Sequence, residues 1–382
     1  LGTDGKGAKI FNIPKQLITD YPFDNNYLDS GTSKVHSVLK DNAGNLWIAI
    51  YQKGVMMIPA QPNSFKYIGY KSINKNIIGS NCITSLCRDH KGILWIGTDN
   101  DGIYGITTEL KQKVHYAPHD SPSSVPSTVF GLYEDSEHNL WFGSYTNGLG
   151  RLDKKTGQCS YLQNLTDKHG NRIQRVYDLV EDQDKRLWIA TMGAGLFYYD
   201  LKTGQSVYDP KFNAATKKYK WISCLLYAGD NHLYVGTYDG IRCIDLSTDD
   251  FKTEEILSRH IIHSLYEDPQ GNIWIGNSEG LAEWNPQTQQ LKTYTTAHGL
   301  SSNAVYAIKG DGQDNLWIST NAGMSRFNLN THTFSNFYAD DGLQGNEFSK
   351  NASFADHNGI LWFGGTNGIT YFNPQEITNP AK

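Results

Sequence analysis

The chain has 382 residues, of which 38% are hydrophobic, 12% are aromatic and 37 are glycines, a composition that fits an all-β repeat protein with many turns. The formal net charge is −5 with acidic and basic residues interleaved, so no basic stripe indicates a nucleic acid partner. No apolar run approaches the roughly 18 residues that a membrane-spanning helix needs, so no segment of this sequence is predicted to cross a bilayer.

One phrase recurs along the whole chain. It reads GILWIGTDNDGIYGI from Gly92 and GILWFGGTNGITYF from Gly359. Self-similarity at a period of 40 to 48 residues indicates a repeat architecture before any single residue is considered. The aromatic residue of each copy is predicted to fill the core between neighbouring units. These aromatics are Trp47, Trp95, Trp141, Trp188, Tyr234, Trp274, Trp317 and Trp362.

Each copy predicts four antiparallel strands in a fixed order. A first strand such as ITSLCRD ends in Asp89, and Gly92 follows three residues later, a spacing typical of a type I turn. The LWIGT run predicts the second strand. The pair Asp101-Gly102 then predicts a type I′ turn, in which both central residues take positive φ, and a third and a fourth strand follow. The same pair recurs as Asn147-Gly148, Asp239-Gly240 and Asn367-Gly368.

Four-stranded units of this length favour a β-propeller over a linear solenoid, because a ring leaves only short edges unprotected. The last copy stops after its third strand, and the fourth-strand sequence FKYIGYK at 65–71 stands before the first of seven copies. We therefore predict an all-β fold with a seven-bladed propeller over residues 64–374, closed by that strand. Residues 1–63 are predicted to be the C-terminal remnant of a preceding propeller, a partial blade plus the Trp47 copy. A single eight-bladed ring is the alternative.

The five cysteines are odd in number and show no CxxC spacing. Cys224 and Cys243 fall on the predicted first and third strands of one blade, about 9.5 Å apart, which is too far for a disulfide. All five are predicted to be free thiols that pack as small hydrophobic groups. They are Cys82, Cys87, Cys159, Cys224 and Cys243.

The unit D-x-x-G-x-L-W-I-G-T-x-x-x-G-[IL] resembles the regulator-propeller repeats in the periplasmic sensor region of Bacteroides-type hybrid two-component histidine kinases. Residues 341–374 are similar to the terminal blade of that family, and residues 375–382 resemble the lead-in to its small immunoglobulin-like domain. The resemblance implies the periplasmic part of an inner-membrane protein, commonly a homodimer, that detects a polysaccharide-derived oligosaccharide and controls glycan-utilisation genes. The transmembrane helix, kinase, receiver and DNA-binding parts would lie outside this sequence.

Two other functions are weighed against a sensor. In a propeller hydrolase or lyase, a sialidase-type turn would place Asp five residues before Trp, whereas Asp89 and Trp95 are six apart. Arginines are scarce and the twelve histidines are scattered, so no catalytic residue, metal site or cofactor is predicted. The remaining alternative is a non-sensing scaffold that only transmits a signal or dimerises.

A ligand site is expected where the repeat is broken, on the face that carries the connections from fourth to first strands and the second-to-third turns. Aromatic faces there could stack on sugar rings, and cations could pair with uronate or sulfate groups. The alternative is that these side chains pack locally or are solvated. The candidates are Arg172, Arg175, Lys220, Trp221, Tyr145 and Tyr238.

Overall fold

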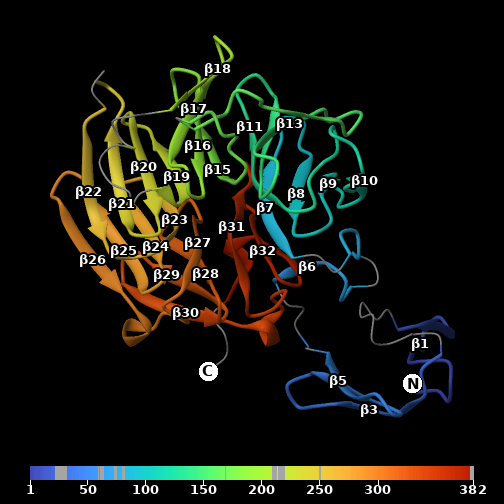
Figure 1. Cartoon of the computed structure of the whole chain (residues 1–382). Helices are drawn as coiled ribbons and strands as arrows, with labels where there is room; N and C mark the ends of the chain where they lie inside the picture. Colours follow the sequence, from blue (N-terminus) through green and yellow to red (C-terminus); the bar gives the residue numbers. More distant parts are fainter. Residues whose placement is uncertain are drawn as a thin grey trace.

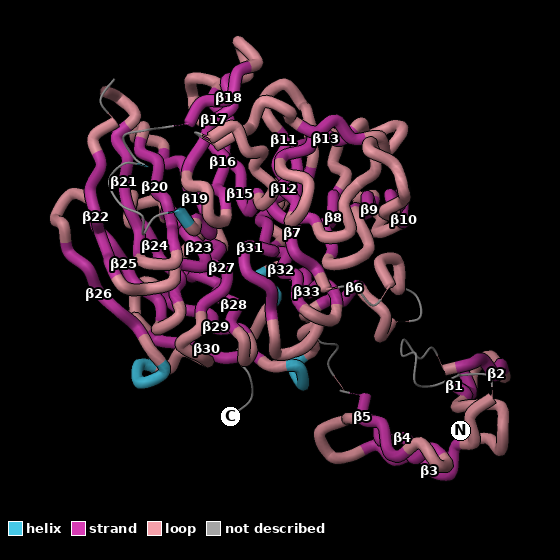
Figure 2. Tube along the Cα trace, viewed as in Figure 1, coloured by secondary structure: helices cyan, strands magenta, loops and turns pink. Residues whose placement is uncertain are grey.

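The computed structural model describes residues 1–21, 32–58, 60, 64–72, 75–79, 82–167, 169–208, 213, 220–248 and 251–378. Its strands form seven four-stranded sheets, one three-stranded sheet and one two-stranded sheet, and every pairing is antiparallel (Figures 1 and 2). The predicted all-β propeller of four-stranded blades is therefore confirmed. The boundaries proposed at residues 63/64 and 374/375 stay predictions, and residues 379–382 of the predicted lead-in lie outside the described residues.

The seven blades are numbered here in chain order, and each blade is a meander whose first strand is innermost. The first strands are β7 (Ile83–Arg88), β11 (Val129–Glu134), β15 (Val176–Glu181), β19 (Ile222–Ala228), β23 (Ile262–Glu267), β27 (Val305–Gly310) and β31 (Phe348–Ala355). The second strands are β8 (Leu94–Thr98), β12 (Leu140–Ser144), β16 (Arg186–Thr191), β20 (His232–Thr237), β24 (Ile273–Asn277), β28 (Asn315–Thr320) and β32 (Leu361–Gly365).

The outer half of each blade follows the same order. The third strands are β9 (Ile103–Ile106), β13 (Leu149–Leu152), β17 (Leu196–Asp200), β21 (Gly240–Asp245), β25 (Gly280–Asn285), β29 (Met324–Asn328) and β33 (Gly368–Phe372). The fourth strands are β10 (Gln112–Tyr116), β14 (Cys159–Tyr161), β18 (Gln205–Tyr208), β22 (Thr253–Ser258), β26 (Gln290–Tyr294), β30 (Thr333–Phe337) and β6 (Lys66–Ile68). Short 3-10 helices are η2 (Thr296–His298), η3 (Ala339–Asp341) and η4 (Pro374–Glu376).

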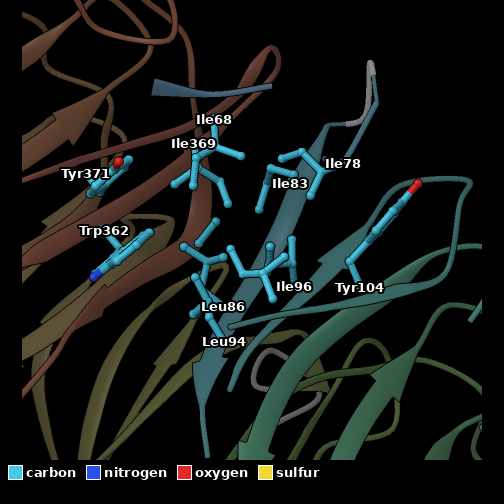
Figure 3. Close-up of a cluster of buried hydrophobic side chains, with 12 residues drawn as sticks. Ile68, Ile78, Ile83, Leu86, Leu94, Ile96, Tyr104, Trp362, Ile369 and Tyr371 are labelled. Atoms are coloured by element: carbon cyan, nitrogen blue, oxygen red, sulfur yellow. The ribbon is translucent and has the colours of Figure 1, made fainter. Parts of the chain in front are cut away.

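The first strands contact one another around a closed circle, from β7 through β11, β15, β19, β23 and β27 to β31 and back to β7. The circle closes as predicted, because β6 completes the seventh blade by pairing with β33, with Ile68 opposite Ile369. Figure 3 shows the resulting core, in which Ile68 and Ile369 lie beside side chains of the first blade. In the same core Trp362 stacks on Tyr371 with ring centroids 4.5 Å apart.

Seven of the eight repeated aromatics are buried between blades, with exposed fractions of 3% or less. The prediction is wrong for Trp47, which is 39% exposed. Trp47 lies on β4 (Leu46–Ile50) in the three-stranded sheet with β3 (Val35–Lys40) and β5 (Gly54–Ile58), and its ring is not covered by a neighbouring blade within the described residues. The remaining two-stranded sheet joins β1 (Lys9–Asn12) to β2 (Leu17–Asp20). All five cysteines are free, as predicted.

The turn between first and second strands forms as predicted. Asp89 Oδ1 accepts the N–H groups of Lys91 and Ile93, and Gly92 takes φ +80°. Its other carboxylate oxygen accepts the indole N–H of Trp95 at 2.9 Å. Four more copies show this indole bond at 2.7 to 2.8 Å. This hydrogen bond explains why Asp and Trp are always six residues apart in these copies.

The predicted type I′ turns between second and third strands are wrong. Within each pair only the glycine has positive φ, as at Gly102 with +74°, whereas Asp101 does not; the other positive φ of this turn is at Asn100, +82°. The hydroxyl that ends the second strand shapes the turn instead: Thr98 Oγ1 donates to the Gly102 carbonyl at 2.9 Å and accepts the Asp101 N–H at 3.2 Å. A Cβ at Gly102 would lie 2.2 Å from the Tyr116 carbonyl oxygen, so close approach of the fourth strand also requires glycine here.

Candidate functional site

A β-bulge places the side chains that line the middle of the ring. In the first strands of blades 1 and 3 to 6, the pairing register shifts between the first and third residues, so the second residue is extra. In blade 2 the shift lies one residue later, between Phe130 and Leu132. A bulge re-aims the side chain of the extra residue. These second residues are Thr84, Phe130, Tyr177, Ser223, His263 and Tyr306. They converge from separate blades on the axis.

A cavity of about 290 Å³ lies where these residues meet. Thr84, Phe130, Tyr177 and Tyr306 line it together with Glu347, Phe348, Ser349, Lys350 and Asn351 of the seventh blade. We call this space the central cavity. Its walls combine aromatic rings with one carboxylate and one ammonium group, a combination that suits a polar ligand with apolar faces.

Four of the six predicted residues lie near the central cavity without lining it: Tyr145, Arg175 and Tyr238 neighbour the lining residues Phe130 and Tyr177, and Trp221 packs on Tyr238. The Arg175 guanidinium lies 4.8 Å from the centre of the Tyr145 ring, and Tyr145 in turn meets the Phe130 ring edge-to-face at 6.4 Å. Phe130 stacks on Tyr177 with centroids 4.5 Å apart. Burial, followed by the proximity of Tyr238 and Tyr145, raises the pKa of Tyr177 to about 12, so its hydroxyl is neutral near pH 7.

Trp221 and Tyr238 extend this aromatic surface over the fourth blade. Their rings are tilted by 40° with centroids 5.8 Å apart, and the Tyr238 N–H donates to the Trp221 carbonyl. Trp221 is 42% exposed and Tyr145 is 45% exposed, so both rings offer a free face. Each ring therefore packs against neighbouring side chains on one face and is accessible to solvent on the other.

The other two predicted residues stand apart. Arg172 donates to the Asn147 carbonyl at 3.2 Å on the outer part of the same face. Lys220 contributes its backbone, because its carbonyl accepts the N–H groups of Gly193 and Gly195 from the preceding blade. None of the six predicted residues is among those that line the central cavity, and these two also make no ring contact with a lining residue among the described contacts.

The inner end of the central cavity is crossed by Asn351. Its Nδ2 donates to the Ser223 carbonyl of blade 4 at 3.1 Å, which spans the axis from the seventh blade. Asn351 has φ +58°, a conformation that Asn tolerates better than most residues. Next to it, Lys350 lies over the Tyr306 ring at 5.6 Å. Burial, reinforced by Lys350, lowers the pKa of His263 to about 3, so this imidazole is neutral.

The sequence did not single out Phe130, Tyr177, Tyr306 or Asn351. The first three occupy equivalent positions in copies about 45 residues apart, and only the ring brings them together. A signal existed: when the copies are aligned on their repeated aromatic residues, the second residue of the first strand differs from copy to copy, while the residue before it is always Ile or Val in blades 1 to 6. No helix within the described residues is long and apolar enough to cross a membrane.

Comparison with known proteins identifies the repeat. A family model described as two component regulator propeller matches residues 77–100, 123–146, 172–193, 256–279 and 299–322. Among curated proteins, Histidine kinase P4 of Formosa agariphila is 24% identical over 386 residues, an alignment that covers 99% of this chain and 21% of that protein.

Two solved structures share the fold. The extracellular domain of the hybrid two component system BT3049 from B. thetaiotaomicron is 23% identical with a TM-score of 0.79, covering 98% of this chain and 49% of that one. The corresponding domain of BT4673 is 18% identical with a TM-score of 0.69, covering 100% of this chain and 51% of that one. The chain thus spans about half the length of these structures and about a fifth of the curated relative. Five of the seven blades of its propeller thus contain a segment that matches the two component regulator propeller repeat.

Proposed function

We propose that this chain is an extracytoplasmic, ligand-sensing part of a larger hybrid two-component protein, and that its ligand is an oligosaccharide released from a polysaccharide whose degradation genes it controls. The observation that carries the proposal is the aromatic surface around the central cavity. Exposed rings of Tyr145 and Trp221 can stack on sugar rings, while Arg175 and Lys350 can pair with uronate or sulfate groups.

The comparisons support the sensor part of the proposal. The matched repeat is described as a two-component regulator propeller, and the curated relative is named a histidine kinase. The similar solved structures are extracellular domains, which supports a periplasmic location for this chain. Attachment to the membrane, a homodimeric state and regulation of transcription belong to the same proposal, and each would depend on the longer protein.

Calorimetric titration with neutral, uronate-containing and sulfated oligosaccharides tests the ligand. Trp221→Ala and Arg175→Ala should each weaken binding by about tenfold or more, because each removes a contact worth about 1–2 kcal/mol. Leu291→Ala and Lys292→Ala on β26 are matched controls, since both side chains are exposed on an outer strand, and they should bind like the wild type.

Three outcomes would count against the proposal. Absence of binding to every oligosaccharide class would remove the ligand assignment. Unchanged binding in Trp221→Ala and Arg175→Ala would exclude the surface formed by these two side chains as the binding site and favour the scaffold alternative. Turnover of any glycan during the titration would identify an enzyme instead of a sensor.

A further inference from the structure

A second cluster of functional side chains lies at the ends of the sheets opposite the central cavity, in the turns between first and second strands. His90 follows β7, Glu134 ends β11, and His138 precedes β12. One ligating atom from each residue lies within 4.8 Å of the other two. The two imidazole rings stack with centroids 3.8 Å apart. The cluster therefore joins the first blade to the second.

The carboxylate alone is a feature of the repeat. Glu134 Oε2 accepts the His90 backbone N–H at 2.7 Å, and Glu181 in the next blade accepts the Ser136 N–H in the same way at 2.7 Å. This hydrogen bond from a backbone N–H to a glutamate thus links neighbouring blades in both places. The side chains of the two histidines are not needed for this backbone contact, so their convergence indicates a further role.

His138 occupies a backbone position that favours glycine. It has φ +67°, and the equivalent residue is glycine in four other copies. These glycines are Gly44, Gly92, Gly271 and Gly359. A strained backbone outlier of this kind often marks a functional position. Lys185 and Asn231 also take positive φ at this position, so positive φ alone does not indicate a site. His138 differs from them because it converges with His90 and Glu134.

The seventh blade shows that the convergence is specific to one pair of blades. His357 occupies the same turn position as His90. Where His90 meets Glu134 and His138, the equivalent residues beside His357 are Arg88 and Gly92 of the first blade. His357 is exposed and belongs to no group of metal-ligating side chains among the described residues.

We propose that His90, Glu134 and His138 form a divalent transition-metal site of the Zn²⁺ type that staples the first two blades. Two imidazole nitrogens and one carboxylate oxygen suit Zn²⁺, with water as a fourth ligand, whereas Mg²⁺ and Ca²⁺ prefer oxygen ligands throughout. In the stacked arrangement the nitrogen lone pairs of the two rings do not point at one common position. The exposed His138 ring therefore rotates about its side-chain torsions when the metal ion binds.

Lys154 is the competing cation and has an alternative partner. Its ammonium lies 2.5 Å from Glu134 Oε1 and 3.4 Å from Asp89 Oδ2. When the metal ion takes Glu134 Oε1, Lys154 keeps the buried Asp89 carboxylate. The ion therefore replaces one positive charge on Glu134 without leaving an ammonium group unpaired.

The test is titration of the untagged chain with Zn²⁺ and, separately, Mg²⁺, followed by calorimetry and melting temperature. The wild type should bind one Zn²⁺ per chain and melt at a higher temperature with Zn²⁺, but not with Mg²⁺. His138→Gly should weaken Zn²⁺ binding at least tenfold, since loss of even an outer partner of a ligand costs about 10–100-fold. Its melting temperature without metal should stay the same or rise, because glycine relieves the backbone.

His357→Ala is the matched control and should bind Zn²⁺ as the wild type does. The proposal is overturned if the wild type shows no stoichiometric Zn²⁺ binding, if His138→Gly binds as tightly as the wild type, or if His357→Ala weakens binding as much as His138→Gly. Because these residues lie away from the central cavity, the outcome is independent of oligosaccharide binding.

Discussion

A single hydrogen bond distinguishes otherwise similar turns of this propeller. Asp268 accepts the N–H groups of Gln270 and Asn272, the Asn272 side-chain amide, and the indole N–H of Trp274 at 2.8 Å. Asp311 in the next blade accepts the equivalent bonds from Gln313 and Asn315. The indole nitrogen of Trp317, however, is buried without a hydrogen-bond partner. Among their hydrogen bonds the two aspartates thus differ by the indole bond, while Asp311 also interacts with the charge of Arg326.

Asp268→Ala should therefore destabilise the chain more than Asp311→Ala. The difference in the free energy of unfolding is expected to be about 1.5–3 kcal/mol, the usual contribution of a hydrogen bond to a charged acceptor. Urea unfolding of both variants and the wild type gives the measurement. An equal loss of unfolding free energy in the two variants would show that the aspartate stabilises the chain through its turn hydrogen bonds alone, with no contribution from the indole bond.

The fourth blade fits the same reasoning. Its repeated aromatic is Tyr234, which has no indole N–H, and the residue six positions earlier is Ala228 instead of aspartate. Both side chains are buried, with 2% and 1% exposed. A carboxylate at position 228 would lack an indole donor. Because this copy lacks both the donor and the acceptor, neither group is left buried without a hydrogen-bond partner.

At the scale of elements, the inner strands bring a carboxylate into the low-dielectric interior. Asp178 on β15 accepts the N–H of Leu225 on β19 at 2.8 Å and that of Leu179 at 2.9 Å. Burial raises the pKa of Asp178 from 3.8 to about 6, although these bonds and Lys309 on β27 act in the opposite direction. The folded chain therefore binds this proton more tightly than the unfolded chain does.

Stability should consequently fall as pH rises through this window. A raised folded-state pKa makes the contribution of Asp178 fully favourable below pH 3.8, and it is lost as pH rises to about 6. Asp178→Asn keeps an acceptor oxygen but does not titrate. Its free energy of unfolding relative to the wild type should increase by about 2.5 kcal/mol between pH 4 and 7. A difference that is flat with pH would contradict the assignment.

The strands and the closure by β6 could be predicted because the repeat spells them out locally. Apolar runs, turn residues and a missing fourth strand are all visible in the sequence. The type I′ turns could not, since the hydroxyl of Thr98 competes with the backbone preference of Asp101-Gly102. Burial of Trp47 was predicted wrongly because its copy has the same sequence pattern as the others, but no neighbouring blade among the described residues covers its ring.

The candidate site could be predicted only in part. Tyr145, Arg175, Trp221 and Tyr238 stood out as departures from the repeat, and they lie beside the lining residues Phe130 and Tyr177 but do not themselves line the central cavity. The cavity walls and the cluster of His90, Glu134 and His138 depend on contacts between blades. Such convergence follows from the number of blades and from the bulge, and neither can be located from one copy alone.

At the scale of the whole molecule, the residues before β6 form a unit with its own small core. Ala8, Val35, Ile48 and Ile50 make up that core, and the core clusters of the ring share no member with it among the described residues. Apolar side chains on the same unit are exposed, as Leu39 is at 62% and Val55 at 66%. So small a core cannot supply much unfolding free energy.

Two thermal transitions are therefore expected in calorimetry of the whole chain, a small one at lower temperature from residues 1–63 and a large one from the ring. A chain that begins at residue 64 should reproduce the large transition within about 2 °C and lose the small one, because β6 still pairs with β33 and closes the seventh blade. If that shorter chain fails to fold, or melts well below the large transition, the first 63 residues stabilise the ring, and the independent unfolding of the two units is contradicted.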